Sequence, residues 1–309
     1  MKSAKGILFI LKSIRLVLVL SITMIFGSCA VMNHRYQKWE NTVNRTPEGI
    51  LDYAVARTWG NGRHALLLIH GFGDGPQVWE KLGPELADRG FTVRAMRLPG
   101  WNEKIAVKRK TTAKEWEEAI LSELESLKTN HDQVVVLAHS LGGCLTTVLA
   151  QKENLSASAL VLYAPMFEVS SARSPFLKTD TWFKIGSKIL PEQLIIESVF
   201  GDHARVVPAR PKTERDPFNP KNIFIRIFEK IDEFEKQKPV ISIPTRLVLP
   251  GEDRVIERDR SLVWFEQLSA PQKTLYIDEE AGHVLPLDLD VLAEVDRLTL
   301  WLKEQGIEL

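Results

Sequence analysis

Cysteine is scarce in this sequence: only Cys29 and Cys144 occur among its 309 residues. No cluster of cysteine and histidine has the spacing of metal ligands, so the sequence predicts no metal site. Basic and acidic residues balance at 40 each and the sequence pI is near 7.1, which gives no reason to expect a nucleic acid partner. Internal repeats and low-complexity tracts are missing as well, which excludes a repeat architecture.

The N-terminal apolar run is too short to span a bilayer comfortably, because a spanning helix needs about 20 apolar residues. This run, Leu16–Phe26, is uncharged and is interrupted only by Ser21 and Thr23. It follows a stretch that carries four basic residues. A basic stretch followed by a short apolar run is typical of a signal peptide, which we predict over residues 1–28.

The signal-like run ends in the letters FGSC, which resemble the lipobox of bacterial lipoproteins, although phenylalanine stands where leucine is commoner. The resemblance implies cleavage before Cys29, lipidation of Cys29 and a tether over residues 29–47. It predicts a membrane-anchored lipoprotein of the bacterial cell envelope. Simple secretion and a single-pass anchor over Ile7–Phe26 are the alternatives, but the second would bury Lys12 and Arg15 in the membrane at substantial cost.

Strand-like and helix-like segments alternate over residues 48–309, which predicts one α/β domain with a mainly parallel sheet and helices on both faces. A chain that is 44% hydrophobic can fill the core of such a domain. We predict strands at Leu51–Ala56, Ala65–Ile69, Thr92–Met96, Gln133–Ala138, Ala159–Ala164, Thr245–Leu249 and Lys273–Ile277. We predict helices at Pro76–Arg89, Thr112–Thr129, Leu141–Lys152, Arg260–Leu268 and Asp288–Glu304.

Residues 166–243 break this alternation, because they hold no clear strand between two predicted core strands. A structureless loop of that length is implausible in a compact domain. Three helix-like pieces, Thr179–Leu190, Pro191–Phe200 and Asn222–Gln237, predict instead a helical cap inserted over the active site. Its many apolar side chains either form a wall for an acyl chain or pack the cap onto the sheet domain.

The stretch LAHSLGGCL, Leu137–Leu145, places Ser140 on a sharp turn between a predicted strand and a predicted helix. Such a turn lifts the serine clear of the sheet and points the first N–H groups of the helix at the group that it attacks. Ala138 stands where the pattern G-x-S-x-G has a glycine, and a small residue there still permits the turn. A serine that merely caps the helix is the alternative.

A serine is a weak nucleophile until a base takes its proton, so a base and an orienting acid are needed. His283 follows the strand predicted at Lys273–Ile277, and Asp253 follows an earlier one. The order serine, aspartate, histidine is that of the α/β-hydrolase triad. Glu252 competes for the acid role, but the order glycine, acid, then a hydrophobic residue two places on favours Asp253.

A glycine-rich loop, HGFGDG at His70–Gly75, follows another predicted strand. We predict that the backbone N–H groups of Phe72 and Leu141 form the oxyanion hole. His70 is expected to hydrogen-bond within its turn, and His139 to help fix the elbow, without acting as the base.

Six motifs from residue 51 onward, HGFGD, RLPG, AHSLGG, YAPM, GEDRV and AGHVL, resemble the α/β-hydrolase superfamily. Within it they are similar to carboxylesterases and monoacylglycerol-lipase-like enzymes of the serine-aminopeptidase-type group. Those relatives follow LPG with histidine and glycine, whereas Trp101 and Asn102 follow here.

The resemblance implies cleavage of carboxylic esters by a serine acyl-enzyme mechanism, without a cofactor. The substrates it implies are medium or long acyl esters or monoacylglycerol-like lipids. A peptidase, thioesterase or acyltransferase would use the same triad, and a catalytically silent binding lipoprotein would keep the same fold. These alternatives remain open at this point.

Overall fold

The computed structural model describes residues 27–172, 178–198 and 215–308. The predicted signal-peptide run Leu16–Phe26 and part of the predicted cap lie outside these residues. Among the helices of the described ranges, none is long and apolar enough to cross a membrane.

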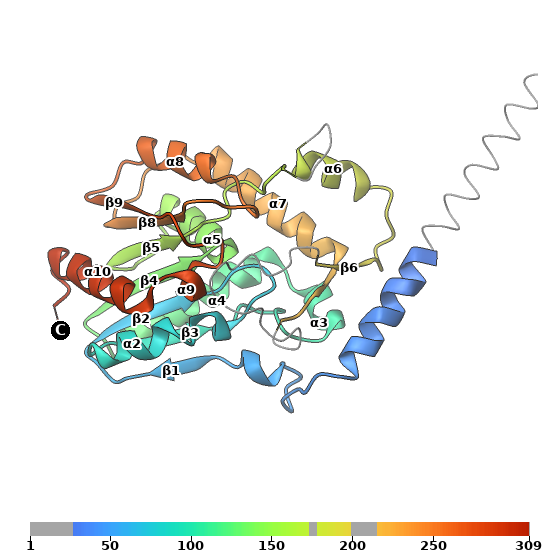
Figure 1. Cartoon of the computed structure of the whole chain (residues 1–309), viewed down its shortest axis with the longest axis horizontal. Coiled ribbons are helices and arrows are strands. Elements are labelled where there is room, and N and C mark those ends of the chain that lie inside the picture. The colour runs from blue at the N-terminus through green and yellow to red at the C-terminus, as the bar shows by residue number, and fades with distance from the viewer. Residues whose placement is uncertain (1–26, 173–177, 199–214, 309) are drawn as a thin grey trace, which may run out of the picture.

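A seven-stranded sheet forms the centre of the described chain, in the order β1-β3-β2-β4-β5-β8-β9 (Figure 1). β1 pairs antiparallel with β3, and all other neighbours are parallel. Every residue of β2, β5 and β8 is buried, as expected for apolar strands with helices on both faces. The predicted α/β-hydrolase sheet is therefore confirmed. The strands are β1 (Arg57–Trp59), β2 (His64–Ile69), β3 (Thr92–Met96), β4 (Gln133–His139), β5 (Ala159–Tyr163), β8 (Thr245–Pro250) and β9 (Lys273–Asp278).

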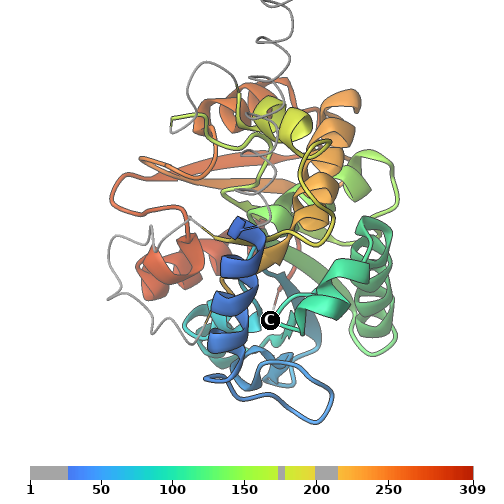
Figure 2. The ribbon, with the colours of Figure 1, turned by 90° about the vertical axis from the view of Figure 1, so that its right-hand side faces the viewer.

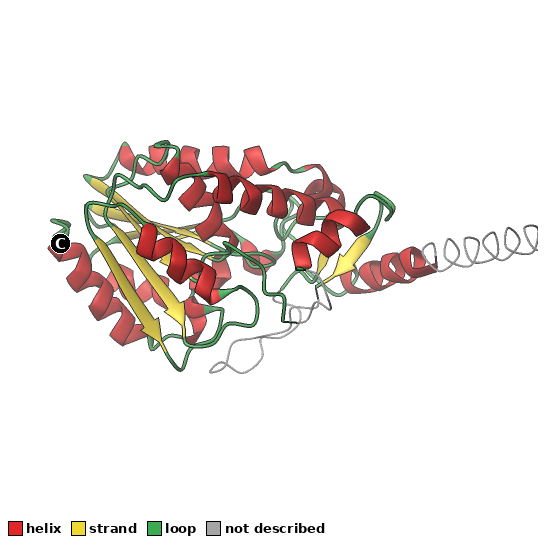
Figure 3. Cartoon of the chain, turned by 90° about the horizontal axis from the view of Figure 1, so that it is seen from above, coloured by secondary structure: helices red, strands yellow, loops and turns green. Residues whose placement is uncertain are grey.

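Helices cover both faces of this sheet, as the views from the front and from above show (Figures 1 and 3). α2 packs against α10, and α4 packs against α5. Thr112 and Glu115 form a capping box at the start of α4, which satisfies backbone donors there. From residue 48 onward, the described helices outside the cap are η1 (Asp52–Ala54), η2 (Pro76–Trp79), α2 (Leu82–Asp88), α3 (Ile105–Lys110), α4 (Ala113–Lys128), α5 (Leu141–Gln151), α8 (Arg258–Gln267), α9 (Leu285–Asp288) and α10 (Val291–Glu304).

The predicted first strand, Leu51–Ala56, is wrong. Its centre is the short 3-10 helix η1, and the strand β1 begins only at Arg57. The Asp52 carboxylate accepts a hydrogen bond from the N–H of Tyr53 at 2.8 Å, and such local bonds compete with strand pairing.

The described part of residues 166–243, which we call the cap, holds α6 (Thr179–Gly186), β6 (Ile195–Glu197), β7 (Phe218–Pro220) and α7 (Lys221–Lys236). α7 matches the predicted helix Asn222–Gln237 closely. The helix predicted at Pro191–Phe200 is wrong, because β6 pairs antiparallel with β7. The partner strand lies far along the sequence, so a local reading could not find this pairing.

Residues 27–40 are helical, and we call them the N-terminal helix. Figure 2 shows this helix in dark blue, running along the cap side of the molecule. The residues predicted as a tether, 29–47, are therefore helical as far as Glu40. Tyr36 of this helix is buried against Ile195 and Phe218 of the cap.

Candidate active site

Ser140 sits between β4 and α5 with φ 51° and ψ −113°. This conformation is strained for a residue other than glycine and costs about 1–3 kcal/mol. Neighbouring backbone holds it in place: Ser140 N–H donates to Tyr163 O at 3.0 Å, and Ser140 O accepts from Met166 N–H at 2.9 Å. The turn predicted for the serine elbow is therefore confirmed, and the serine Oγ lies within hydrogen-bond distance of His283 Nε2.

The three predicted triad side chains meet in one chain of hydrogen bonds. His283 Nε2 lies 3.0 Å from Ser140 Oγ, and His283 Nδ1 lies 2.7 Å from Asp253 Oδ2. The other carboxylate oxygen of Asp253 accepts from the N–H groups of Val255 and Ile256 at 2.7 Å and 3.0 Å. The histidine is thus held between a hydroxyl and a carboxylate, the arrangement in which an imidazole can move a proton.

Asp253 is the carboxylate that holds His283, and the competing Glu252 is exposed. Burial by itself would raise the pKa of Asp253. The contact with His283 and the two backbone donors outweigh burial, so the pKa of Asp253 lies below its ordinary value. Asp253 is therefore ionised at neutral pH and able to stabilise a charged imidazole.

His70 and His139 are both buried, and burial lowers the pKa of His70 to about 4 and that of His139 to about 3. His70 Nδ1 lies 2.9 Å from Gly71 O, and His70 Nε2 accepts from the N–H of Leu98 at 3.0 Å. His139 Nε2 lies 2.9 Å from the carbonyl oxygen of His283. Both neutral rings fix loops of the site. His70 bonds within its own turn, as the sequence predicts, whereas His139 bonds to the loop that carries His283.

The two predicted oxyanion donors lie on neighbouring segments. Leu141 is the first residue of α5, so its N–H has no acceptor within the helix. Phe72 lies on the loop after β2, which approaches the elbow closely: a Cβ added at Gly71 would lie 2.8 Å from Ser140 Cβ. Only glycine permits this approach. The oxyanion role of Phe72 and Leu141 stays a prediction.

Trp101 and Asn102, the departure from the relatives' motif, support this loop. The buried Trp101 ring meets the Phe72 ring edge-on, with centroids 5.3 Å apart. Asn102 has φ 59° and donates from Nδ2 to Asp74 O at 2.7 Å. The sequence revealed an unusual pair here, but only the fold shows that the pair packs beneath the predicted oxyanion loop.

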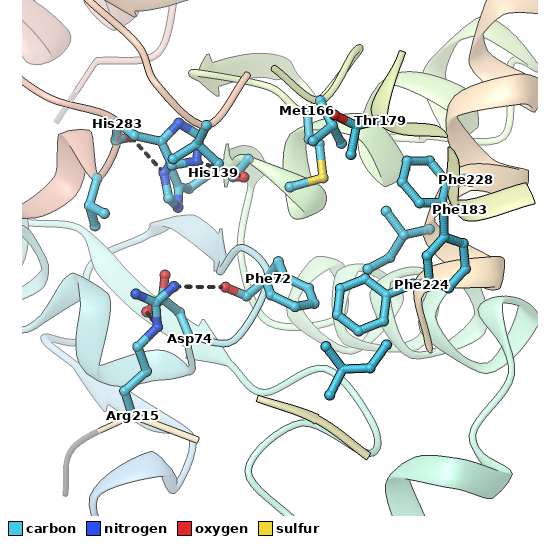
Figure 4. A pocket seen from close by; sticks show the side chains of 16 residues that line it. Phe72, Asp74, His139, Met166, Thr179, Phe183, Arg215, Phe224, Phe228 and His283 are labelled. Carbon is cyan, nitrogen blue, oxygen red and sulfur yellow. Dashed lines mark hydrogen bonds and ion pairs between the residues drawn. The ribbon is translucent and has the colours of Figure 1, made fainter. Parts of the chain in front are cut away.

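A cavity of about 210 Å³ opens beside Ser140. Figure 4 shows histidines and a charged pair toward one side and phenylalanines toward the other. The apolar side chains of the cap divide between two places: Phe183 lines the cavity, whereas Phe167 stacks on Phe234 in the core. No group of residues suited to a metal ion occurs in the described ranges. The apolar lining consists of Phe72, Met166, Val169, Phe183, Ile196, Phe224, Ile227, Phe228, Val255 and Val284.

An ion pair between Arg215 and Asp74 also lines this cavity, and the sequence reading missed it. Arg215 Nε lies 3.8 Å from Asp74 Oδ1, and Arg215 Nη2 donates to Phe72 O at 3.4 Å (Figure 4). Asp74 could have been singled out from the sequence, because it is the acidic residue of the loop HGFGDG. Arg215 has no motif, because it reaches the loop from the cap.

The sheet, the serine elbow and the cavity define an α/β-hydrolase. A family model described as serine aminopeptidase, S33, matches residues 60–290, and the chain belongs to this family. Human monoglyceride lipase is 22% identical over 301 residues, which cover 86% of this chain and 96% of that protein.

Two further comparisons agree with this class. A pimeloyl-[acyl-carrier protein] methyl ester esterase of Aromatoleum aromaticum is 40% identical over 100 residues, which are 32% of this chain and 36% of that protein. The crystal structure of Paleococcus ferrophilus monoacylglycerol lipase has a TM-score of 0.65 at 20% identity, covering 81% of this chain and 98% of that one. The protein is a monoglyceride lipase-like α/β-hydrolase of the esterase and lipase type.

Proposed function

We propose that this protein cleaves carboxylic esters with medium or long acyl chains, monoacylglycerol-like lipids among them, through an acyl-enzyme on Ser140. The observation that carries the proposal is the hydrogen-bond chain from Ser140 through His283 to Asp253 at the edge of an apolar cavity. Human monoglyceride lipase, which aligns over most of this chain, supports the choice of substrate.

In the first half of the reaction, Ser140 Oγ attacks the ester carbonyl carbon while His283 Nε2 takes the hydroxyl proton. The negative charge that develops on the carbonyl oxygen receives hydrogen bonds from the N–H groups of Phe72 and Leu141. Asp253 keeps His283 in the required tautomer and stabilises its positive charge. The bond to the alcohol then breaks, and His283 gives its proton to the leaving oxygen.

In the second half, a water molecule attacks the acyl group on Ser140, and His283 removes one proton from that water. The same hydrogen bonds stabilise the second oxyanion. Collapse breaks the bond to Ser140 Oγ, which recovers the proton from His283. The carboxylic acid leaves, and the site returns to its starting state.

The nucleophile assignment is tested by labelling with a fluorophosphonate probe. We expect the wild type to be labelled and Ser140→Ala to lose the label entirely, because the probe reacts only with an activated serine. Ser126→Ala, an exposed serine on α4, is the matched control and should be labelled like the wild type. Full labelling of Ser140→Ala would refute the assignment, and an unlabelled wild type would favour a catalytically silent binding protein.

The substrate class is tested with an octanoyl chain on several leaving groups and with a separate peptidase substrate. Octanoyl esters of p-nitrophenol and glycerol, an octanoyl thioester and an amino-acid amide separate esterase from thioesterase and peptidase activity. We expect the esters to give the highest kcat/KM. A preference for the amide would favour the peptidase alternative, and transfer of the acyl group to an added alcohol would favour the acyltransferase.

We also propose that Cys29 carries the lipid anchor of a bacterial lipoprotein. The FGSC motif and the basic, apolar N-terminal segment support this proposal. Membrane attachment would bring the enzyme to a surface from which lipid esters are drawn.

A further inference from the structure

The less exposed residues of the N-terminal helix fall on one face. Cys29, Met32, Tyr36 and Trp39 follow one another at spacings of three and four, which places them in one stripe along the helix. Tyr36 is the most buried of them, at 5% exposure. A stripe of this kind indicates that the helix is packed against a defined partner.

The partner is the small two-stranded sheet of the cap. The Tyr36 ring meets the Phe218 ring edge-on, with centroids 5.7 Å apart, and the Trp39 ring lies 5.5 Å from the same ring. Arg35 forms an ion pair with Glu197 at 2.7 Å. These contacts join the N-terminal helix to both β6 and β7.

Strand β6 separates the N-terminal helix from the substrate cavity. Successive side chains of a strand point to opposite faces. Accordingly, Ile195 packs with Tyr36 in a small apolar cluster, whereas the next residue, Ile196, lines the cavity. The wall of the cavity at this point is one strand thick, and the N-terminal helix covers its outer side.

The two strands of this sheet are held differently. β7 is bound to the sheet domain through the fully buried Lys108, whose Nζ donates to Phe218 O at 3.0 Å and to Asn219 Oδ1 at 3.3 Å. β6 reaches the sheet domain through its pairing with β7 and, two residues before its start, through Arg109 of α3, whose Nη2 donates to Gln193 O at 3.2 Å. Its outer face rests on the N-terminal helix. The position of Ile196 therefore depends in part on that helix.

We infer that Tyr36 and Trp39 are positioning residues for the acyl pocket: through β6 they hold Ile196 in the cavity wall. The inference rests on the proposed function for its substrate. It makes the membrane-proximal segment a working part of the enzyme, because the helix that follows the proposed lipid anchor also shapes the site.

The test uses the full chain with Tyr36→Ala and Trp39→Ala combined. Without the two rings, β6 can move away from the cavity and Ile196 no longer contacts a long acyl chain. We expect the ratio of kcat/KM for p-nitrophenyl octanoate to that for p-nitrophenyl acetate to fall about tenfold, through a higher KM for the octanoate. Amide hydrogen exchange at residues 195–197 should become about tenfold faster, while exchange in β4 stays unchanged.

Two variants serve as controls. Val31→Ala lies on the same helix but is 55% exposed, so it should leave the ratio and the exchange unchanged. The single variant Tyr36→Phe retains both aromatic rings and should retain most of the octanoate preference.

A folded double variant with the wild-type ratio and wild-type exchange in β6 would overturn the inference. If the wild type cleaves no ester, the proposed function fails, and hydrogen exchange alone decides the positioning role. Should the double variant not fold, Trp39→Ala is measured alone against the same criterion.

Discussion

At the scale of single residues, Asp253 is the carboxylate whose Oδ2 lies 2.7 Å from His283 Nδ1, and the proposed mechanism assigns it the orienting role. We expect Asp253→Asn to lower kcat by about four orders of magnitude, because an amide can donate to Nδ1 and stabilise the wrong tautomer. Glu252→Gln, one position away, should change kcat little. Both are measured as ester hydrolysis by purified, folded protein. A large loss of kcat in Glu252→Gln together with an active Asp253→Asn would show that Glu252, and not Asp253, has the acid role.

The two buried histidines predict a pH dependence of stability. Burial lowers the pKa of His70 to about 4 and that of His139 to about 3, against about 6.5 in an unfolded chain. Between these values the unfolded chain binds more protons than the folded one, so the free energy of unfolding falls as the pH drops below about 6.5. Denaturant unfolding at pH 7, 6 and 5 measures this slope.

His70→Gln should remove one of the two contributions and reduce the slope by up to about 1.4 kcal/mol per pH unit. The exposed His34 offers the control, since His34→Gln should leave the slope unchanged. A wild-type stability that stays flat from pH 7 to pH 5 would contradict the buried neutral histidines.

Single residues in motifs could be found from the sequence, whereas residues that reach the site across space could not. Ser140, Asp253 and His283 stand in short patterns that each follow a strand, so their types and order sufficed to bring them together. Arg215 stands in no motif. Its place beside Asp74 depends on the path of the cap, which local sequence does not encode.

At the scale of elements, α6 offers a matched pair of aromatic residues. Phe183 lines the cavity, whereas its neighbour Trp182 is 43% exposed and lies outside the lining. We expect Phe183→Ala to lower kcat/KM most for long acyl esters, since each buried methylene is worth about 0.8 kcal/mol. Trp182→Ala should leave the dependence of kcat/KM on chain length unchanged. The measurement is kcat/KM over p-nitrophenyl esters from acetate to laurate. Equal effects of the two changes, or a wild type that prefers acetate, would contradict an acyl pocket beneath the cap.

The predicted elements succeed where the apolar pattern is local and fail where a distant partner decides. β3 matches its predicted bounds, and α4 begins at a capping box that is legible in the sequence. By contrast, Ile195–Glu197 is a strand only because β7 pairs with it. The short helix α3, which carries the buried Lys108, also went unpredicted, since three basic residues gave it no apolar face.

At the scale of the whole molecule, the N-terminal helix connects the proposed anchor to the catalytic domain. Cys29 lies seven residues before Tyr36, which is about 10 Å along a helix axis. Tyr36 in turn packs on the cap. A lipid on Cys29 would therefore keep the cap side of the enzyme, with its cavity, close to the membrane surface.

Lipidation of Cys29 predicts that the protein stays with membranes through washing. A single acyl chain binds a membrane weakly and reversibly, but a bacterial lipoprotein cysteine carries more than one, which gives stable attachment. We expect metabolic labelling with an alkyne fatty acid to mark the wild type in the membrane fraction, and Cys29→Ser to lose both the label and the membrane attachment. Cys144→Ser is the matched control, because Cys144 is buried in α5 and should leave labelling unchanged. An unlabelled wild type, or a soluble product that begins after residue 29, would contradict the anchor. That result would leave the hydrogen-bond chain at Ser140 unaffected. Secretion or an uncleaved N-terminal anchor would then replace the lipoprotein anchor as the proposed localisation.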